Sequence, residues 1–358
     1  MSDGSLKARL KAEIEAAGPI SIPAYMLRCL HDPVHGYYAT RPRLGADGDF
    51  ITAPLVSQMF GELIGVWAVE TWRRLGKPSP FHLVELGPGD ATLMSDALRA
   101  GRIDPNFLSA CCVTLVETSP LLIEQQRRRL AEAAVPIVWA NDLDGLSDGP
   151  MLLIANEFLD CLPATQLVRT VSGWAEQRVG LDQAGELCFG LASLPLDPPA
   201  GLEAAKVGDL WEVSPLQMEL GRQVAQRIRQ FDGAALFLDY GRATRGPGDT
   251  LQALIRHERA DPLSSPGQAD LTMWADFPSL IEGVAEGGVA VSGPIDQGRF
   301  LRRLGIDARA ARLARSRPDG SAKIARQVAR LTDHDQMGDL FKVCAVHRAG
   351  LAPPGFEE

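Results

Sequence analysis

Short apolar runs alternate with helix-length segments over most of the chain after residue 80. The runs are FHLVEL (81–86), CCVTLVE (111–117), PIVWA (136–140), MLLIA (151–155) and AALFLDYG (234–241). Continuous apolar runs of this length are typical of parallel strands that are covered by helices on both faces. The pattern predicts a doubly wound α/β fold with helices at 90–101, 119–134 and 215–231 and final strands at 288–293 and 339–347.

Two stretches depart from this alternation and predict insertions. Residues 163–213 lack the helical segments and favour a small antiparallel β meander, whereas 294–338 is helical and rich in arginine. Residues 1–80 are helical and loop-like, and an amphipathic helix is expected near their start. The predicted division is therefore an N-terminal helical and lid region (1–80), an α/β domain with both insertions (81–347) and a C-terminal tail (348–358).

Composition narrows the class of protein. The chain has 358 residues, of which 46% are hydrophobic and 23% charged, and its net charge is −9. This acidic balance argues against a nucleic-acid coat protein, because phosphate binding depends on a positive surface. Six cysteines without a C-x-x-C pair indicate neither a disulfide scaffold nor a structural zinc site. Cysteines this sparse predict a reduced, cytoplasmic chain. No signal-peptide pattern and no apolar run of about 18 residues appear, so no membrane span is expected.

The sharpest local motif follows the first predicted strand. It reads Glu85-Leu86-Gly87-Pro88-Gly89-Asp90-Ala91-Thr92 and opens a helix. Its glycines allow a tight turn and let a ligand approach backbone N–H groups at the helix N-terminus. A dinucleotide site would have a third glycine where Thr92 stands. An acid two residues before Gly87 suits a ligand with a cationic amine, although a tight turn without a ligand is the alternative.

Acids also follow the next two strands. Glu117 could accept both hydroxyls of a ribose, because a carboxylate offers two acceptor oxygens. Asp142 could face an adenine amino group. Either acid alone could be a solvated strand end. Together with Glu85 they are expected to converge on the crevice where open α/β sheets bind ligands.

Polar residues after the fourth run are the candidate catalytic groups. Asn156, Glu157 and Asp160 stand where the reactive end of a cofactor would project. Asn156 capping a helix, with Glu157 favourable near its positive end, is an equally good explanation for either acid alone.

Four other features have less specific explanations. His31 and His35 have a spacing that could bind a metal, but Pro33 breaks the helix between them and no third ligand is apparent. Tyr37 and Tyr38 could belong to a substrate or lid surface or to the core, and Asp239 and Tyr240 could line the substrate side. The arginine-rich stretch favours a solvated helical face, with the docking of an acidic partner protein as the alternative. Its arginines are Arg299, Arg302, Arg303, Arg309, Arg312, Arg315 and Arg317.

These motifs together resemble a known family. The glycine turn with its preceding acid is similar to the cofactor loop of class I S-adenosylmethionine-dependent methyltransferases. From about residue 20 to 347 the chain resembles the MidA-like family, whose mitochondrial members serve the assembly of respiratory complex I. The stretches that carry the resemblance are HDPVHGYY, GDFITAPLVSQMFGELIG, LVELGPGDATLM, NEFLDCLP, LDYG, DPLSSPGQADLT and MGDLFKV.

The resemblance implies a Rossmann-like methyltransferase that uses S-adenosylmethionine, with an arginine of a protein as the acceptor. The mitochondrial relatives are understood to modify symmetrically an arginine of a complex I subunit, which makes such a subunit the expected partner here. The resemblance assigns to the cofactor Glu85, Gly87, Pro88, Gly89, Glu117 and Asp142, together with Thr52 in GDFITAP, which would close over it. The turn departs from relatives by having Asp90-Ala91-Thr92, and NEFLDCLP departs by having Cys161.

Arginine methylation gives the acids a possible task. Arginine is a poor nucleophile because its charge is delocalised and it remains protonated. Glu157 and Asp160, with Asn156 beside them, could grip the guanidinium and localise charge away from the attacking nitrogen. Two other functions remain: a non-catalytic S-adenosylmethionine-binding assembly factor, and a nucleotide-dependent oxidoreductase, which Thr92 and the lack of a hydride-relay pair disfavour.

Overall fold

The computed structural model describes residues 5–40, 52–192, 201–202, 204–255, 258–285 and 288–357. In this part of the chain the largest sheet has the order β15-β16-β10-β5-β2-β3-β4, with β14 beside β10. Its strands are β2 (Phe81–Leu86), β3 (Cys111–Val116), β4 (Ile137–Ala140), β5 (Met151–Asn156), β10 (Gly233–Arg242), β14 (Ala275–Asp276), β15 (Ala290–Asp296) and β16 (Phe341–His347). The strands from β4 to β10 are parallel, and β16 runs antiparallel to β10. This sheet confirms the α/β fold predicted from the apolar runs.

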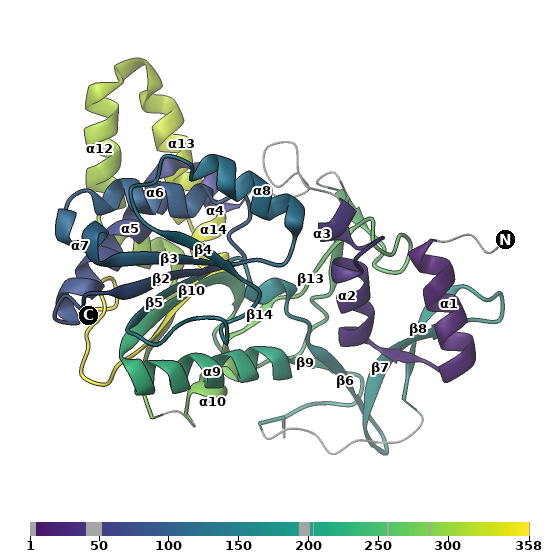
Figure 1. Cartoon of the computed structure of the whole chain (residues 1–358). Coiled ribbons are helices and arrows are strands. Elements are labelled where there is room, and N and C mark those ends of the chain that lie inside the picture. Colours follow the sequence, from purple (N-terminus) through teal and green to yellow (C-terminus); the bar gives the residue numbers. More distant parts are fainter. Residues whose placement is uncertain are drawn as a thin grey trace.

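Helices cover both faces of the large sheet (Figure 1). One face packs against α5 (Gln58–Arg74), α6 (Thr92–Gly101) and α7 (Pro105–Ala110), and the other against α9 (Pro215–Phe231) and α10 (Phe277–Ala285). Helix α8 (Pro120–Arg129) follows β3. Helices α5 and α6 can approach closely because Gly65 has no side chain. A Cβ atom at this position would lie only 2.6 Å from the carbonyl oxygen of Ala97. Fully buried Trp67 and Phe60 of α5 fill the core on that face.

Two smaller sheets flank the large one. The first contains β1 (Ile20–Ser21), β6 (Thr165–Thr170), β7 (Gly173–Leu181), β8 (Leu187–Leu191) and β9 (Leu210–Val213). All its pairings are antiparallel, which confirms the predicted meander. The sequence did not predict that β1 joins it. It also did not predict the second sheet, β11 (Gln252–Ile255), β12 (Glu258–Ala260) and β13 (Asp270–Thr272).

The N-terminal helices pack on these smaller sheets. They are α1 (Leu6–Ala17), α2 (Ile22–His31) and α3 (Tyr37–Thr40), whereas the short helix α4 (Ala53–Val56) packs against α5 and α6. Tyr25 and Met26 of α2 are fully buried in a cluster that also contains Val179 of β7 and Leu271 of β13. Ser5 and Ser21 accept N–H bonds at the starts of α1 and α2, as expected of helix N-caps. The predicted division of the chain into residues 1–80, 81–347 and 348–358 remains a prediction.

The arginine-rich insertion forms four helices. They are α11 (Gln297–Arg303), α12 (Ile306–Ser316), α13 (Ser321–Thr332) and α14 (Met337–Leu340). Helices α12 and α13 form a hairpin that projects from the body of the molecule (Figure 1). Among the described residues, no helix is both long and apolar enough to span a membrane.

Candidate active site

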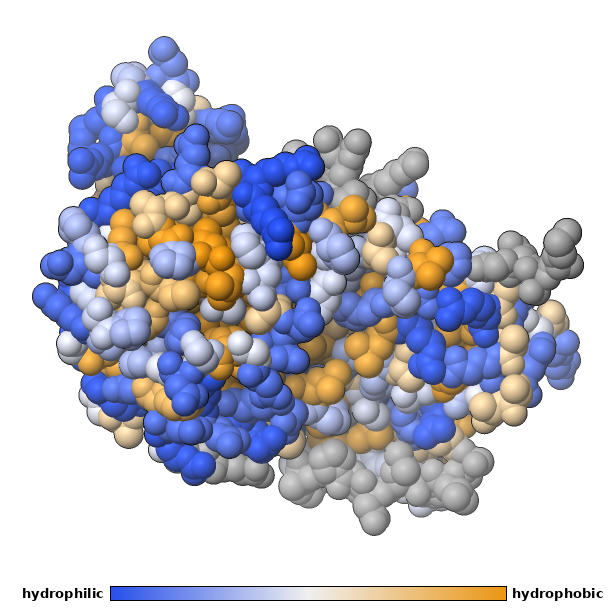
Figure 2. All heavy atoms as spheres, in the orientation of Figure 1, coloured by the Kyte–Doolittle hydropathy of each residue, from blue (hydrophilic) through white to orange (hydrophobic). Residues whose placement is uncertain are grey.

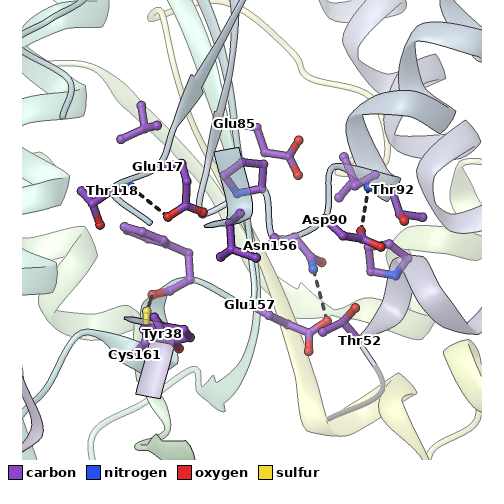
Figure 3. Close-up of a pocket in the computed structure, with 18 of the residues that line it drawn as sticks. Tyr38, Thr52, Glu85, Asp90, Thr92, Glu117, Thr118, Asn156, Glu157 and Cys161 are labelled. Carbon is purple, nitrogen blue, oxygen red and sulfur yellow. Dashed lines mark hydrogen bonds between the residues drawn. The ribbon is translucent and has the colours of Figure 1, made fainter. Parts of the chain in front are cut away.

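A cavity of about 310 Å³ lies at the carboxyl ends of β2, β3 and β5 (Figure 3). Most of the residues predicted for the site contribute to its wall, namely Thr52, Glu85, Gly87, Pro88, Gly89, Glu117, Asn156 and Glu157. Asp142 and Asp160 do not line it. The convergence follows from the parallel strands, whose carboxyl ends meet at one edge of the sheet.

The glycine turn between β2 and α6 has a backbone that few side chains permit. Gly87 has φ +58° and Gly89 has φ +54°, which is the left-handed region. A Cβ atom on Gly87 would lie 2.8 Å from Cδ2 of Phe158. Ala91, two residues after Gly89, adopts the same region with φ +61°. At Gly87 and Gly89 the turn therefore presents backbone without a side chain to the cavity.

Glu85 supplies a buried carboxyl group to the cavity. The residue is 3% exposed, and among the described residues its Oε2 has no hydrogen-bond partner. Burial, with a smaller contribution from the negative charge of Asp90, raises its pKa well above the ordinary value. An unpaired buried carboxyl requires either a proton or a cation. The group therefore fits a ligand that brings a positive amine.

Glu117 is held in place by three hydrogen bonds. Its Oε1 accepts the backbone N–H groups of Thr118 and Ser119, each at 2.8 Å, and its Oε2 accepts from Nε2 of Gln126 at 3.3 Å. Burial raises its pKa, and these bonds oppose the shift. The fixed carboxylate at the cavity wall is suited to accept hydroxyl groups, as predicted for a ribose.

Gln126 is a functional residue that the sequence analysis missed. Its side chain is fully buried, and it donates to the carbonyl oxygen of Gly89 at 2.8 Å while it accepts from Nε1 of Trp139 at 2.8 Å. It thereby connects Glu117, the glycine turn and β4. The available signal was the spacing of Leu122 and Gln126, the two buried residues of α8, which lie four apart on its inner face.

Asn156 and Glu157 lie at the end of β5 beside the N-terminal segment. Oε1 of Glu157 accepts the backbone N–H of Ala53 at 2.8 Å. It also accepts a hydrogen bond from Nδ2 of Asn156 at 3.2 Å (Figure 3). Burial raises the pKa of Glu157 to about 8, although both bonds oppose that shift. Glu157 has φ +50°, which is uncommon for a residue with a side chain. Oδ1 of Asn156 is buried without a partner among the described residues.

Asp160 lies behind the cavity wall rather than in it. It belongs to a 3₁₀ turn (Leu159–Cys161), whose Leu159 and Asp160 N–H groups donate to Oδ2 of Asp239 at 2.8 and 3.1 Å. Burial raises the pKa of Asp160 to about 6, and a hydrogen bond from Tyr240 opposes this. The pKa of Asp239 is raised well above its ordinary value by burial and by Asp160. These acids form a buried cluster next to the site.

The remaining candidates are distributed around the rim. Asp142 is exposed and accepts the N–H of Gly145 at 3.0 Å, while the adjacent Asn141 lines the cavity. Tyr38 also lines it, with its ring 5.4 Å from that of His31, so this tyrosine belongs to the cavity surface. In GDFITAP, the part before Thr52 lies outside the described residues.

The fold and the site define the class of protein. The strand order, the glycine turn with a buried acid before it and a second acid after the next strand form a Rossmann-like site for a nucleoside ligand that carries a positive amine. S-Adenosylmethionine has both parts.

Comparisons with known proteins agree with this class. Residues 63–295 match the family described as "Putative S-adenosyl-L-methionine-dependent methyltransferase". A relative from Drosophila melanogaster, named protein arginine methyltransferase NDUFAF7 homolog, mitochondrial, is 37% identical over 98% of this chain and 86% of its own. The human protein arginine methyltransferase NDUFAF7, mitochondrial, is 35% identical over 94% of this chain and 82% of its own.

A solved structure shares nearly the whole fold. It is described as a "likely methyl transferase from Burkholderia thailandensis bound to S-adenosyl-homocysteine", with a TM-score of 0.83 and 27% identity over 99% of this chain and 92% of that one. The chain belongs to this S-adenosylmethionine-dependent methyltransferase family. The predicted enzyme class and cofactor are thus confirmed.

The predicted cytoplasmic location was wrong. The fly, rat and human relatives are all named as mitochondrial proteins. The prediction depended on cysteine usage, which does not distinguish one reducing compartment from another.

Proposed function

We propose that this methyltransferase acts on an arginine side chain of a protein. The observation that carries the proposal is the carboxyl group of Glu157 at the end of β5, in the wall of the cavity that also contains the glycine turn. The relatives that are named protein arginine methyltransferases support it. The acceptor protein is proposed to be a subunit of respiratory complex I, on the resemblance to the MidA-like family.

Each residue proposed to hold the cofactor would contact a different part of it. Glu85 pairs with the positive amine, Glu117 accepts the ribose hydroxyls, and the turn at Gly87 and Gly89 leaves room for the ligand beside the backbone. Thr52, Pro88 and Asp142 are proposed to complete the site. Bound there, S-adenosylmethionine supplies an activated methyl group, so the protein mainly has to align the nucleophile.

Glu157 is proposed to bind and orient the guanidinium. Its Oε1 is engaged by Ala53 and Asn156, so its Oε2 is the atom proposed to accept the guanidinium N–H groups. The pairing draws positive charge toward the carboxylate and away from the attacking nitrogen. Transfer of the methyl group would exchange its bond to the sulfonium sulfur for a bond to that nitrogen, leaving a neutral thioether and one proton for the nitrogen to release. The bound guanidinium favours the ionised form of Glu157. Oε2 is then suited to accept the proton, because burial gives this carboxyl a high proton affinity, with a pKa of about 8 in the ligand-free protein.

Asp160 is proposed to act through Glu157. It lies outside the cavity wall, and its negative charge is one of the causes that raise the pKa of Glu157. Asp160 would therefore adjust the proton affinity of Glu157 without touching the substrate. This differs from a direct grip by two carboxylates.

The test is transfer of labelled methyl groups to proteins of a cell extract by wild-type protein and by Glu157→Gln. The variant should lose about a hundredfold or more of the transfer rate, because a positioned acid–base group contributes roughly 10²–10⁴. Its affinity for S-adenosylhomocysteine should stay within about twofold of wild type. Glu132→Gln, at an exposed residue of the loop after α8, is the matched control. Full activity in Glu157→Gln with intact cofactor binding would remove this residue from the mechanism.

A further inference from the structure

The hairpin of α12 and α13, residues 306–332, has an unusual charge for this protein. It contains seven basic and two acidic residues, a net charge of +5 in a chain of net charge −9. We call it the basic arm. It projects from the body of the molecule, and its surface is mostly hydrophilic, with apolar residues where the two helices meet (Figures 1 and 2).

Six of the seven cations are exposed and lack a carboxylate partner within the described ranges. They are Arg312, Arg315, Arg317, Lys323, Arg326 and Arg330. On α12, Arg312 and Arg315 are three residues apart, and on α13 Lys323, Arg326 and Arg330 follow at three and four, so each helix has a basic stripe. Like charges on one helix face repel one another. A partner with negative charges would relieve this repulsion, which favours formation of the complex.

The chemistry of the surface favours an acidic protein as that partner. No large hydrophobic side chain of residues 306–332 is exposed, whereas a helix that binds a membrane surface inserts such side chains. All but one of the exposed cations are arginines, whose planar guanidinium groups bind carboxylates with two parallel hydrogen bonds. The net charge of −9 repels a nucleic acid from the rest of the molecule.

The base of the basic arm is fixed beside the cavity. Arg309 donates to the buried Glu62 of α5, from Nε at 2.7 Å and Nη2 at 3.0 Å. Gln327 donates to the carbonyl oxygen of Val56 at 2.6 Å. Val56 ends α4, the helix whose first N–H group binds Glu157 and whose Pro54 and Leu55 line the cavity. A protein bound to the arm therefore lies next to the cavity.

We propose that the basic arm docks an acidic surface of the protein that is to be methylated. The inference rests on the proposed function in taking the substrate to be a protein. The docking itself is a separate property, because it depends on exposed arginines that do not line the cavity. It would supply affinity and orientation at a distance from the reacting arginine, and it would be weakened by salt.

The test is a titration of labelled peptides at low ionic strength, followed by fluorescence anisotropy. The probe is a 16-residue Glu/Ala peptide, with a Gln/Ala peptide of the same length as its neutral counterpart. The arm variant is Arg312→Glu/Arg315→Glu/Arg326→Glu. The matched control reverses three exposed arginines elsewhere, Arg102→Glu/Arg229→Glu/Arg259→Glu, and changes the net charge equally.

Wild type and the matched control should bind the acidic peptide alike, and the arm variant about tenfold or more weaker, since three exposed attractions become repulsions. The neutral peptide should not bind, and neither single-stranded RNA of 16 nucleotides nor vesicles with anionic lipid should bind as well as the acidic peptide. Equal binding by the arm variant, equal loss in the matched control, or stronger binding of RNA or vesicles would overturn the proposal. Because no methyl transfer is measured, failure here is distinct from failure of the proposed function.

Discussion

Replacement of Glu85 by glutamine should change the pH dependence of stability and of cofactor binding in opposite directions. The carboxyl is 3% exposed, and burial raises its pKa above the ordinary 4.5. A raised pKa in the folded protein means that its contribution to stability is fully present below 4.5 and is lost as the pH rises through the folded value. The free energy of unfolding of ligand-free wild type, relative to Glu85→Gln, should therefore fall as the pH rises.

Ligand affinity should show the reverse trend. A cationic amine binds the ionised carboxylate, so wild type should bind S-adenosylhomocysteine more tightly as the pH rises from 5 to about 8. Binding should release up to one proton where Glu85 is protonated in the free protein. A hydrogen bond to a charged group contributes about 1.5–3 kcal/mol, so Glu85→Gln should weaken binding roughly 10- to 150-fold at the upper end of this range.

Two measurements test both trends. Calorimetric titration in two buffers of different ionisation enthalpy gives the affinity and the number of protons released, and urea unfolding over the same pH range gives the free energy of unfolding. Glu85→Gln should release fewer protons than wild type, and its affinity and free energy of unfolding should change less with pH than they do in wild type. Equal affinity and equal proton release in the two proteins would refute the assignment of Glu85 to the amine.

Three further predictions concern the cavity wall and the base of the basic arm. Glu117→Ala should lower the affinity for S-adenosylhomocysteine, measured by calorimetry, roughly ten- to a hundredfold. Because three hydrogen bonds are lost, the free energy of unfolding should also fall by about 1–3 kcal/mol. If both values are unchanged, Glu117 is an ordinary strand-end acid. Gly87→Val should abolish binding in a folded protein, since its Cβ would lie 2.8 Å from Phe158 at φ +58°, and binding within a few-fold of wild type would contradict this. Glu62→Gln should lower the free energy of unfolding by about 1–3 kcal/mol in chemical unfolding at neutral pH. Burial alone would raise the pKa of Glu62, but Arg309 and Arg99 hold it below its ordinary value. The difference in stability between wild type and variant should therefore shrink as acid protonates Glu62.

The strands and the glycine turn could be predicted because their causes are local. Buried parallel strands need continuous apolar runs, and each predicted run of the large sheet corresponds to an observed strand. The glycines at positions 87 and 89 predict a tight turn, and both have positive φ values in the structure. Position at a strand end was then sufficient to bring Glu85, Glu117 and Glu157 to one cavity.

Side-chain direction beyond a strand end was not predictable in the same way. Asp142 and Asn141 are neighbours after β4, and only Asn141 lines the cavity, because the loop turns where Asp142 accepts the N–H of Gly145. Asp160 follows Glu157 by three residues, but the segment is a 3₁₀ turn held by Asp239 and not a continuous helix. A difference of one residue in the loop therefore decides whether a side chain lines the cavity or lies outside it.

Long-range pairings were also beyond the sequence. The strand β1 pairs with β7 across more than 150 residues of chain, Ile20 facing Val179, and nothing local to Ile20 indicates it. Gln126 is polar and buried, so the apolar pattern does not include it, and its spacing of four from Leu122 is the one sequence signal that places it on the inner face of α8.

The most direct test of the account is the identity of the methylated residue. Wild-type protein is incubated with extract proteins and S-adenosylmethionine labelled in its methyl group, and the labelled proteins are hydrolysed completely and separated by chromatography. The account predicts label in methylated arginine, with wild-type activity in Glu132→Gln and about a hundredfold less in Glu157→Gln. Label in methyl-lysine, or no label in protein from enzyme that binds S-adenosylhomocysteine, would contradict it.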